Sequence, residues 1–579
     1  MLEEPLIAAA QPVQAPARAF LDRHFRLCTA VLLVIMAAAQ IVAALLDSQV
    51  VDEGYHLTAG YMFLRTGELN AETEHPPLAQ ALTALPLLTM PLRLPRPVTE
   101  GYSEGHREVD FLYRNTVPAD RILLAARCGH ICFTLLLGIL IAWWTRKYFG
   151  PSASLAALAL LAFEPNFLAH GHYATTDVPA ALCFFAACLA WSAYLRSGGF
   201  WRAALSGAAV AVAMSTKYSA VFLFPIFFLL YVLAWWHRSG TPGPRPFQAS
   251  FRHFTVSMAV VLLAMGPVLD VCFGFEAGPL FSVAHGRAPG PGWSQMPAII
   301  QWAAATIPIP APSMLHGIFI LLRHNLGGHV SYLLGRYSET GWWYYFPVVM
   351  AVKTPAGILL AFALSIIAAA AAWRKRALRS LPIEWHVLIV PPLFYFAMAL
   401  RSHIDIGIRH MLPLYPFVFV WIGAALFVPR ALRSRRIAAA AALCLALTVV
   451  ESAGAFPRYL AFFNFPSGGR AHGWKYVADS NLDWGQDLKR LQTYVAQHHI
   501  ANVCLGDFPV TSPEYYGFAV KPLPASMDEA RAQGCIVAAS ITHTVEWPLW
   551  QHDYAWVARE HPVDQVGDSF WIYDPAISR

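Results

Sequence analysis

The chain has 579 residues, of which 57% are hydrophobic and only 13% are charged, and its formal net charge is +6. Soluble domains carry about a quarter charged residues, so this composition excludes an ordinary soluble protein and indicates an integral membrane protein. No zinc-finger spacing or basic stripe is present, which argues against a nucleic-acid partner.

The first apolar run extends from about residue 28 to residue 46 and follows Arg18, Arg23 and Arg26. At ~1.5 Å per residue this run can cross a bilayer core of ~30 Å. We expect an uncleaved signal anchor with a cytoplasmic N-terminus.

Further apolar runs follow near residues 123–144, 152–168, 178–195, 203–236, 255–273, 345–372, 385–400, 411–428 and 437–455. As one helix, the run 203–236 would extend ~51 Å, far more than a bilayer requires. The polar residues 215–219, which include Lys217, interrupt it. We therefore predict two spans in this run and eleven spans in total.

The distribution of basic residues supports this count. Outside loops are poor in Lys and Arg apart from Lys217, Arg401 and Arg409. Inside loops contain basic clusters near residues 146–147, 196–202, 238–252, 374–379 and 430–436. This is the positive-inside pattern, and one span at 203–236 would reverse every later loop. The extracytoplasmic polar stretches are then 47–120, 169–177, 274–343 and the tail from about 456.

The tail has the pattern of a small α/β unit. Residues 484–499 have helical spacing, with Asp483 or Asn481 as a cap, and residues 503–508, 536–540 and 569–573 have the pattern of short strands. Cys504 and Cys535 are the two cysteines of the tail, and they could pair in an oxidising compartment.

The expected fold class is therefore a polytopic α-helical membrane protein with a small extracytoplasmic α/β domain. We place the transmembrane domain at 1–455 and the α/β domain at 456–579. The long stretch 274–343 is rich in Pro, Gly and Trp, and we expect it to lie along the membrane interface.

Two motifs follow the first apolar run. Asp52 and Glu53 come first, and the segment His75-Pro76-Pro77-Leu78-Ala79 comes second. Ionisable residues at a membrane surface are candidates for functional sites. Adjacent helical positions point ~100° apart, so one carboxylate could act as a base while the other orients a partner or holds a loop. The alternatives are a solvated loop start and an ordinary helix N-terminus behind a stiff proline corner.

Several cations converge on the same predicted face. Arg127 lies within the run 123–144, Lys217 lies in the polar break, and Arg409 precedes the run 411–428. A buried cation requires an anion, and no acid follows at matched helical spacing. A lipid-linked phosphate is a reasonable partner, because Arg and Lys bind phosphate through charge-assisted hydrogen bonds. Snorkelling to lipid headgroups is the alternative, and it suits Arg409 better than Arg127.

Three further residues are weaker candidates. Asp177 precedes an apolar run, where a helix N-cap is the default interpretation. His172 forms an i,i+2 pair with His170, but no third metal ligand follows nearby. Lys353 could reach the outer interface by snorkelling. Whether a divalent metal takes part is left open.

The sequence resembles the protein O-mannosyltransferase family and its bacterial relatives, which are polytopic, polyprenyl-phosphate-dependent glycosyltransferases of the GT-C class. The resemblance rests on the segments 52–53, 75–79, 124–127, 216–218, 345–347, 353–355 and 479–488. The last three resemble a bacterial branch of the family. Nothing in the tail resembles the large lumenal insert of the eukaryotic members.

The resemblance implies a role for several residues. Asp52 would be the catalytic base with Glu53 as its support, the His75 segment would shape the site, and Arg127 and Lys217 would contact the carrier phosphate. The implied partners are a polyprenyl-phosphate sugar donor, membrane lipids, and a glycan, lipid or protein acceptor.

The residues fit this chemistry independently of the resemblance. A sugar on a lipid phosphate carries its own leaving group, so cations can stabilise the developing charge while a carboxylate removes the proton of the acceptor hydroxyl. Direct displacement would invert the anomeric carbon. One rival is a flippase or transporter for lipid-linked glycans, although repeated halves are not found. Another is a transferase of the same fold that modifies lipid A or another glycan. The chain has no N-x-S/T sequon, which favours a bacterial inner-membrane protein.

Overall fold

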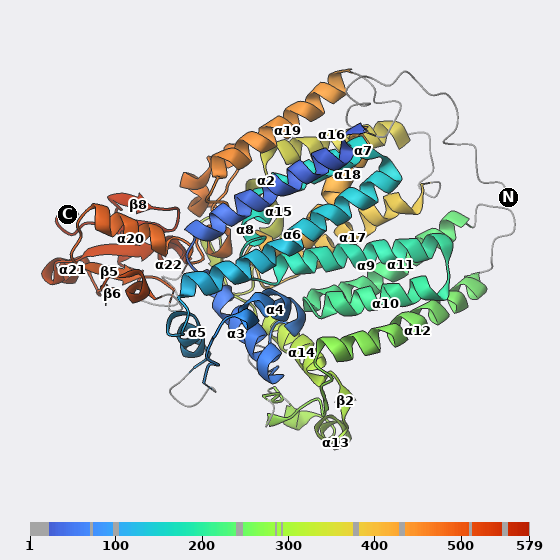
Figure 1. The fold of residues 1–579 in the computed structure, drawn as a ribbon, viewed down its shortest axis with the longest axis horizontal. Helices are drawn as coiled ribbons and strands as arrows, with labels where there is room; N and C mark the ends of the chain where they lie inside the picture. The colour runs from blue at the N-terminus through green and yellow to red at the C-terminus, as the bar shows by residue number, and fades with distance from the viewer. Residues whose placement is uncertain are drawn as a thin grey trace.

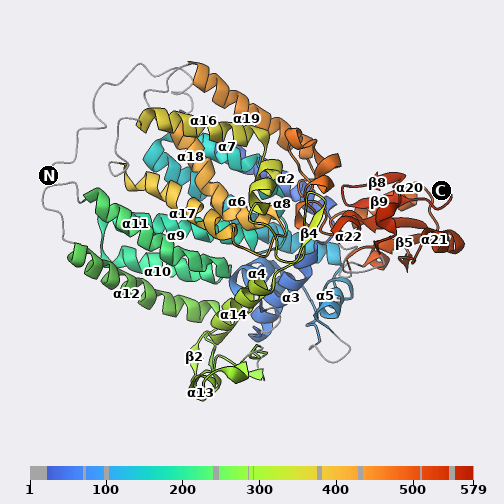
Figure 2. The same cartoon turned by 180° about the vertical axis from the view of Figure 1, so that it is seen from behind.

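The computed structural model describes residues 23–69, 73–96, 103–238, 247–283, 286–290, 293–373, 381–427, 435–508, 512–546 and 554–577. Most of these residues form a bundle of long helices, and a small α/β unit lies at one end of the bundle (Figure 1). Seen from both sides, α16 and α19 lie along one edge of the bundle, whereas α10 and α12 lie along the opposite edge (Figures 1 and 2).

Each predicted apolar run coincides with helical structure. The bundle comprises α2 (Phe25–Leu46), α6 (Ala119–Phe149), α7 (Pro151–Ala162), α8 (Pro165–His170), α9 (Asp177–Ser197), α10 (Phe200–Met214), α11 (Leu223–Arg238), α12 (Phe247–Cys272), α15 (Tyr345–Lys353), α16 (Ala356–Trp373), α17 (Ile383–Ala399), α18 (Tyr415–Phe427) and α19 (Arg435–Ala455). Long apolar runs must form helices in a bilayer, because every backbone polar group requires an internal partner there.

The number of spans is smaller when each helix is judged alone. In the described ranges, seven helices are long and apolar enough to cross a membrane, or eight if the bent pair α15 and α16 is one span. The predicted break in 203–236 is confirmed, since α10 ends at Met214 and the next helical segment begins at Tyr218. Because α7, α10 and α17 are shorter than a usual span, the total of eleven stays a prediction.

Some residues used to predict sidedness lie outside the described ranges. They are Arg18, Arg245 and the basic clusters at 374–379 and 430–434.

The first external stretch is largely helical. It contains α3 (Val51–Thr66), α4 (Pro77–Ala84), the 3-10 helix η1 (Leu85–Thr89) and α5 (Glu104–Tyr113). Pro77 occupies the first helical position of α4, where its fixed φ is compatible with the helix and its missing N–H costs nothing. Gly60 lets α3 approach α4 closely, because a Cβ there would lie 2.3 Å from the carbonyl oxygen of Gln80. This approach brings the His75 segment beside α3.

The stretch 274–343 contains β1 (Ala277–Gly278), the 3-10 helix η4 (Trp293–Gln295), α13 (Ala298–Thr306), β2 (Ile309–Pro310), α14 (Pro312–Gly327), β3 (Ser331–Leu333) and β4 (Arg336–Ser338). Of these, α13 and β2 project from the bundle (Figure 1), whereas Tyr332 and Leu333 of β3 pack in its core. Strands β1 and β2 pair antiparallel, as do β3 and β4.

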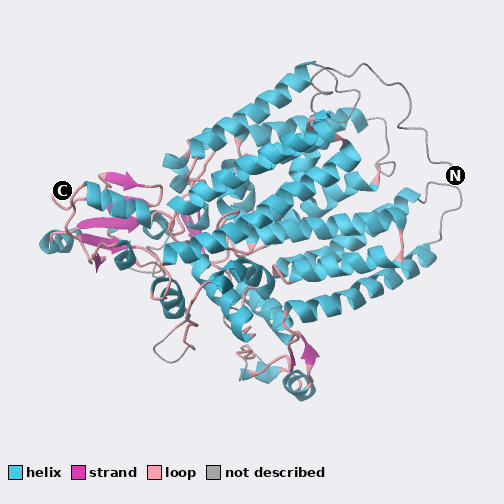
Figure 3. Cartoon of the chain, in the orientation of Figure 1, coloured by secondary structure: helices cyan, strands magenta, loops and turns pink. Residues whose placement is uncertain are grey.

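The α/β unit holds a five-stranded sheet with the order β6-β5-β7-β9-β8, and most strands of the described ranges lie in it (Figure 3). Its elements are α20 (Leu488–Gln497), β5 (Val503–Gly506), β6 (Val520–Pro522), α21 (Met527–Gln533), β7 (Ile536–Ser540), α22 (Ile541–Glu546), β8 (Asp564–Val566) and β9 (Phe570–Tyr573). The three predicted strands correspond to β5, β7 and β9, whereas β6 and β8 were not predicted. Cys504 and Cys535 form a disulfide.

The predicted helix at 484–499 begins four residues too early. Gly485 has a left-handed backbone (φ 96°), and the carbonyls of Trp484 and Gln486 accept hydrogen bonds from Val51 and Ser48. The left-handed residue and these two backbone contacts are incompatible with a helix at 484–486, and α20 starts at Leu488. The core of the sheet also begins at Leu488, whereas buried residues between 459 and 484 pack in the core of the helical bundle.

Candidate active site

The side chains of Asp52 and Glu53 point to different parts of the structure, as their helical positions predicted. Both lie in the first turn of α3. Asp52 accepts a hydrogen bond of 2.5 Å from Nη1 of Arg409, which belongs to the 3-10 helix η6 (Ile408–Leu414). The side chain of Asp52 is 23% exposed and that of Arg409 is 10% exposed, so this ion pair borders open space.

Asp52 is held in its ionised form. Burial alone would raise the pKa of its carboxyl, but the positive charges of Arg409 and His56 outweigh burial, and the pKa lies below its usual value. The hydrogen bond from Arg409 and the charge of His75 lower it further. At neutral pH the carboxylate is therefore deprotonated, which a general base requires before it can accept a proton.

Glu53 forms a different kind of pair. Its two oxygens accept hydrogen bonds from Nε and Nη2 of Arg127 at 2.8 and 2.6 Å, and both side chains are fully buried. The carboxylate also accepts the backbone N–H groups of Val50 and Ala174. Glu53 thus fixes the start of α3 against α6 and the turn after α8.

Arg127 has no donor left for a phosphate. Its remaining N–H groups bind the carbonyls of Ala44, Asp47 and Ser48 at 2.6 to 2.9 Å. All five donors of the guanidinium are then occupied by the protein. The expectation that Arg127 contacts the carrier phosphate is therefore corrected: the residue ties α6 to the end of α2 and to α3.

Lys217 has a carboxylate partner that sequence spacing did not suggest. Its ammonium donates to Oδ1 of Asp177 at 2.5 Å, across the gap between the end of α10 and the start of α9. The sequence offered no acid at matched helical spacing for Lys217, Arg409 or Arg127, yet each has a carboxylate partner. The partners come from distant segments rather than from matched positions on the same helix. Asp177 is not an N-cap, since that position belongs to Thr176.

Unpaired polar atoms surround these two pairs. Oδ2 of Asp177, Nε of Arg409, Nε2 of His410 and both ring nitrogens of His170 are buried without a protein hydrogen-bond partner. The charge of Asp177 acts on Arg409, His170 and His410, so the four groups share one region. Buried polar groups are otherwise nearly always paired, and such a cluster therefore indicates a place for water or for a polar ligand.

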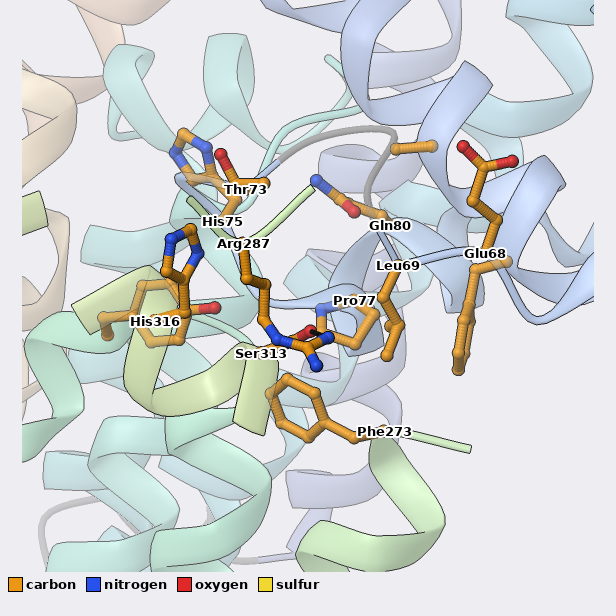
Figure 4. Close-up of a pocket in the computed structure, with 13 residues that line it drawn as sticks. Glu68, Leu69, Thr73, His75, Pro77, Gln80, Phe273, Arg287, Ser313 and His316 are labelled. Atoms are coloured by element: carbon orange, nitrogen blue, oxygen red, sulfur yellow. Dashed lines mark hydrogen bonds between the residues drawn. The ribbon is translucent and has the colours of Figure 1, made fainter. Parts of the chain in front are cut away.

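His75 lies on the wall of a pocket beside this region. The pocket is lined by α3, by residues 73–80, by Phe273 just after α12, and by Arg287, Ser313 and His316 (Figure 4). The ring of His75 meets that of His56 edge-on, with 4.8 Å between the centroids, and Gln80 is hydrogen-bonded to His56 at 3.1 Å. The His75 segment therefore borders both Asp52 and the pocket.

Two predicted candidates lie away from open space. His172 is bonded to Oδ2 of Asp47 and to the carbonyl of Leu168, and it is fully buried. Lys353 is also fully buried, and its ammonium donates to the carbonyls of Leu460 and Asn481. The snorkelling interpretation of Lys353 is wrong. Among the described side chains, no group of three or more His, Cys, Asp or Glu residues has a geometry that could hold a metal ion.

Two residues of the site received no role from the sequence. The indole of Trp484 lies against the guanidinium of Arg409, 4.3 Å from the ring centroid to the central carbon. Asp479 has a left-handed backbone (φ 55°), and burial raises the pKa of its carboxyl although the charge of Arg409 opposes this. Both belong to the segment 479–488. The resemblance of this segment to a bacterial branch of the family was the only indication in the sequence that these two residues could belong to the site.

Residues 120–269 match the sequence model of the family described as dolichyl-phosphate-mannose-protein mannosyltransferase. The expected resemblance is confirmed over this segment. The match supports a likeness to glycosyltransferases of the GT-C class, and the segment includes Asp177 and Lys217 but neither Asp52 nor Arg409.

Solved structures with a similar course of the chain include a protein O-mannosyltransferase and an oligosaccharyltransferase. The S. cerevisiae protein O-mannosyltransferase Pmt1-Pmt2 complex bound to its sugar donor is 13% identical, with 75% of this chain and 90% of that chain covered and a TM-score of 0.49. The Archaeoglobus fulgidus oligosaccharyltransferase in its apo form is 12% identical, with 92% and 72% covered and a TM-score of 0.44. No curated protein sequence matches the chain.

Proposed function

We propose that this chain transfers a sugar from a polyprenyl-phosphate-linked donor to a hydroxyl group of a glycan, lipid or protein acceptor on the extracytoplasmic face of the membrane. The family match supports the class of reaction. One observation supports the chemical assignment: the carboxylate of Asp52 meets the guanidinium of Arg409, 357 residues later in the chain, beside a region of unpaired polar atoms.

The proposed reaction is a single displacement with inversion. Asp52 takes the proton of the acceptor hydroxyl while the acceptor oxygen attacks the anomeric carbon. The bond between that carbon and the phosphate oxygen breaks, and its electron pair leaves with the polyprenyl phosphate. Arg409 and Lys217 stabilise the negative charge that develops on this leaving group.

Arg409 would then have two partners in turn. Without donor it is paired with Asp52, and its Nε has no partner. A phosphate that binds Arg409 competes with Asp52 for the guanidinium, and the loss of this hydrogen bond makes the carboxylate a stronger base. Donor binding would therefore activate the base at the time when it is needed. Lys217 would share its charge in the same way between Asp177 and the phosphate.

Glu53 and Arg127 have a supporting role in this proposal, because every hydrogen-bonding position between them is occupied. We further propose that the site and the α/β unit are extracytoplasmic in a bacterial inner membrane and that the chain leaves the membrane at 455/456, so that the residues from 456 onward are extracytoplasmic although those up to 484 pack against the bundle. The positive-inside pattern and the missing sequons support this placement.

The test uses the purified full-length protein and a panel of radiolabelled polyprenyl-phosphate sugars. We expect release of free polyprenyl phosphate with at least one donor, and loss of that release in Asp52→Asn. Asp110→Asn is the matched control: Asp110 lies on α5 and pairs with the exposed Arg114 just after that helix, so this substitution should leave release unchanged.

Two results would contradict the proposal. The first is release that Asp52→Asn does not diminish. The second is movement of intact labelled donor across vesicle membranes with no release of carrier, which is the behaviour of a flippase.

A further inference from the structure

The segment 479–487, which we call the bracket, joins the helical bundle to the α/β unit. The residues just before the proposed base and just before its cation both bind to it. The N–H of Val51 donates to the carbonyl of Trp484 at 3.0 Å, and the N–H of Ile408 donates to Oδ1 of Asn481 at 2.9 Å. One short segment therefore holds the backbone at both ends of the Asp52–Arg409 pair.

The bracket also contacts the cation itself. The indole ring of Trp484 lies 4.3 Å from the guanidinium carbon of Arg409 and is 3% exposed. A cation over an aromatic face is attracted by the ring quadrupole, and the planar guanidinium is well suited to stacking. The ring thus leaves the edge of Arg409 directed towards Asp52 and the unpaired polar atoms.

The α/β unit fixes the other side of the bracket. Oδ2 of Asp483 accepts hydrogen bonds from Oγ of Ser540 and from the N–H of Thr542, at the end of β7 and the start of α22. Oδ2 of Asp487 accepts a hydrogen bond from Oγ of Ser569, beside β9. These side chains are buried, so the bracket is built into the unit rather than laid on its surface.

The bundle anchors the bracket as well. The ammonium of Lys353 donates to the carbonyl of Asn481, and Oγ of Ser480 donates to the carbonyl of Ile406. The N–H of Ser48 donates to the carbonyl of Gln486 at 2.9 Å.

We propose that the α/β unit is part of the active site, because it holds the bracket that sets the positions of Asp52 and Arg409. Trp484 and Asn481 are positioning residues: they act through the base and the cation and need not contact substrate. This inference rests on the proposed function for the roles of Asp52 and Arg409. The bracket's own geometry does not depend on that function.

The first experiment measures amide hydrogen exchange in the full-length protein in detergent. In Trp484→Leu and in Asn481→Leu, the amides of Val51 and Ile408 should exchange roughly tenfold faster, as expected when one hydrogen bond or its support is lost. Trp556→Leu is the matched control, since Trp556 lies in the same unit and binds the carbonyl of Pro524, away from the bracket. Exchange at Val51 and Ile408 should be unchanged in this control.

The second experiment measures transfer in the same variants. We expect kcat to fall by roughly 10- to 100-fold in Trp484→Leu with little change in the KM for donor, because the base and cation lose their alignment. Trp484→Phe should recover most of the loss, since it keeps an aromatic face under Arg409. A merely structural role would not predict this recovery.

Two substitutions away from Trp484 test the same inference if Trp484→Leu does not fold. Ser540→Ala and Thr542→Val remove contacts to Asp483 from inside the α/β unit, and both should accelerate exchange at Val51 and Ile408. Tyr494→Phe, which removes a hydroxyl bonded to Asp564 on the far side of the unit, should not.

The two proposals can fail separately. If no donor is turned over, the proposed function is wrong, while the exchange measurement still decides whether the bracket holds Val51 and Ile408. If folded bracket variants show exchange at these two amides equal to the controls, the α/β unit does not position the site and the inference is overturned.

Discussion

Two neighbouring residues at the start of α3 form two arginine–carboxylate pairs of opposite character. The Glu53–Arg127 pair is fully buried, and the protein occupies all five donors of the arginine. The Asp52–Arg409 pair borders open space, and Nε of its arginine is unpaired. Both pairs join a guanidinium to a carboxylate, and they differ in whether the protein occupies every donor of the arginine. Where all donors are occupied, the pair stabilises the fold. Where a donor is unoccupied, the arginine can bind a third group.

The helix itself produces this difference. Consecutive residues on α3 project ~100° apart, so one carboxylate faces α6 while the next faces η6. Removal of the two carboxylate charges in turn should have different effects: loss of the Asp52 charge should reduce transfer, and loss of the Glu53 charge should reduce stability.

The largest effect is expected for Asp52→Asn. Loss of the general base should reduce transfer by roughly 10²- to 10⁴-fold. The Asp52–Arg409 pair borders open space, where solvent can screen the remaining charge, so the thermal unfolding temperature should stay close to that of the wild type. Turnover is measured as release of free carrier, and unfolding is measured in the same detergent. Near-normal turnover would exclude Asp52 as the base.

Glu53→Gln should act on stability instead. It leaves the buried charge of Arg127 without a counter-ion, which typically costs about 3–5 kcal/mol. The measurement is equilibrium or thermal unfolding in detergent. Glu384→Gln is the control, because Glu384 pairs with Arg196, whose side chain is 34% exposed, and a partly exposed pair contributes much less. A Glu53→Gln protein as stable as the wild type but inactive would show that Glu53 takes part in the reaction.

The helical bundle could be predicted from the sequence, since each apolar run must satisfy its own backbone in lipid. The break around Lys217 could also be predicted, because a charged residue and its polar neighbours interrupt an otherwise continuous apolar run. Strand β7 matched its predicted bounds, 536–540.

The pairing of charges could not be predicted. Arg409 meets Asp52 across 357 residues, and Lys217 meets Asp177 across 40 residues and two helices. No periodic pattern marks such contacts, because they depend on how whole elements pack. That every donor of Arg127 is occupied could not be predicted for a related reason: three of its five hydrogen bonds go to backbone carbonyls, which every residue possesses. The resemblance identified the segment that contains Trp484, but it did not predict that this indole would lie against Arg409.

Arg409→Gln should change the pH dependence of transfer. In the wild type the pKa of Asp52 is depressed, so the active carboxylate is present throughout the neutral range and is lost only as pH falls through that low value. Without the charge of Arg409, burial raises this pKa, and the acidic limb of the kcat/KM profile should move to higher pH. Activity at neutral pH should also fall by roughly 10- to 100-fold, as expected for a lost charge-assisted hydrogen bond.

An acidic limb at the same pH in both proteins would contradict the assignment of Arg409 as the group that sets the pKa of Asp52. Arg114→Gln, at an exposed position just after α5, is the control for loss of one positive charge.

The smallest effect is expected for the donor KM, which should distinguish Lys217 from Lys353, the two lysines identified as candidates in the sequence. Lys217 is 15% exposed and shares Asp177, whose second oxygen is unpaired, whereas Lys353 is fully buried and donates only to backbone carbonyls. Lys217→Met should therefore raise the KM for a polyprenyl-phosphate donor by roughly tenfold, which corresponds to one charge-assisted contact with phosphate. Lys353→Met should leave that KM unchanged and lower the unfolding temperature, because two carbonyls lose their donor. Equal effects of the two substitutions on donor KM would show that the phosphate contacts lie elsewhere, since only Lys217 borders the region where a phosphate could bind.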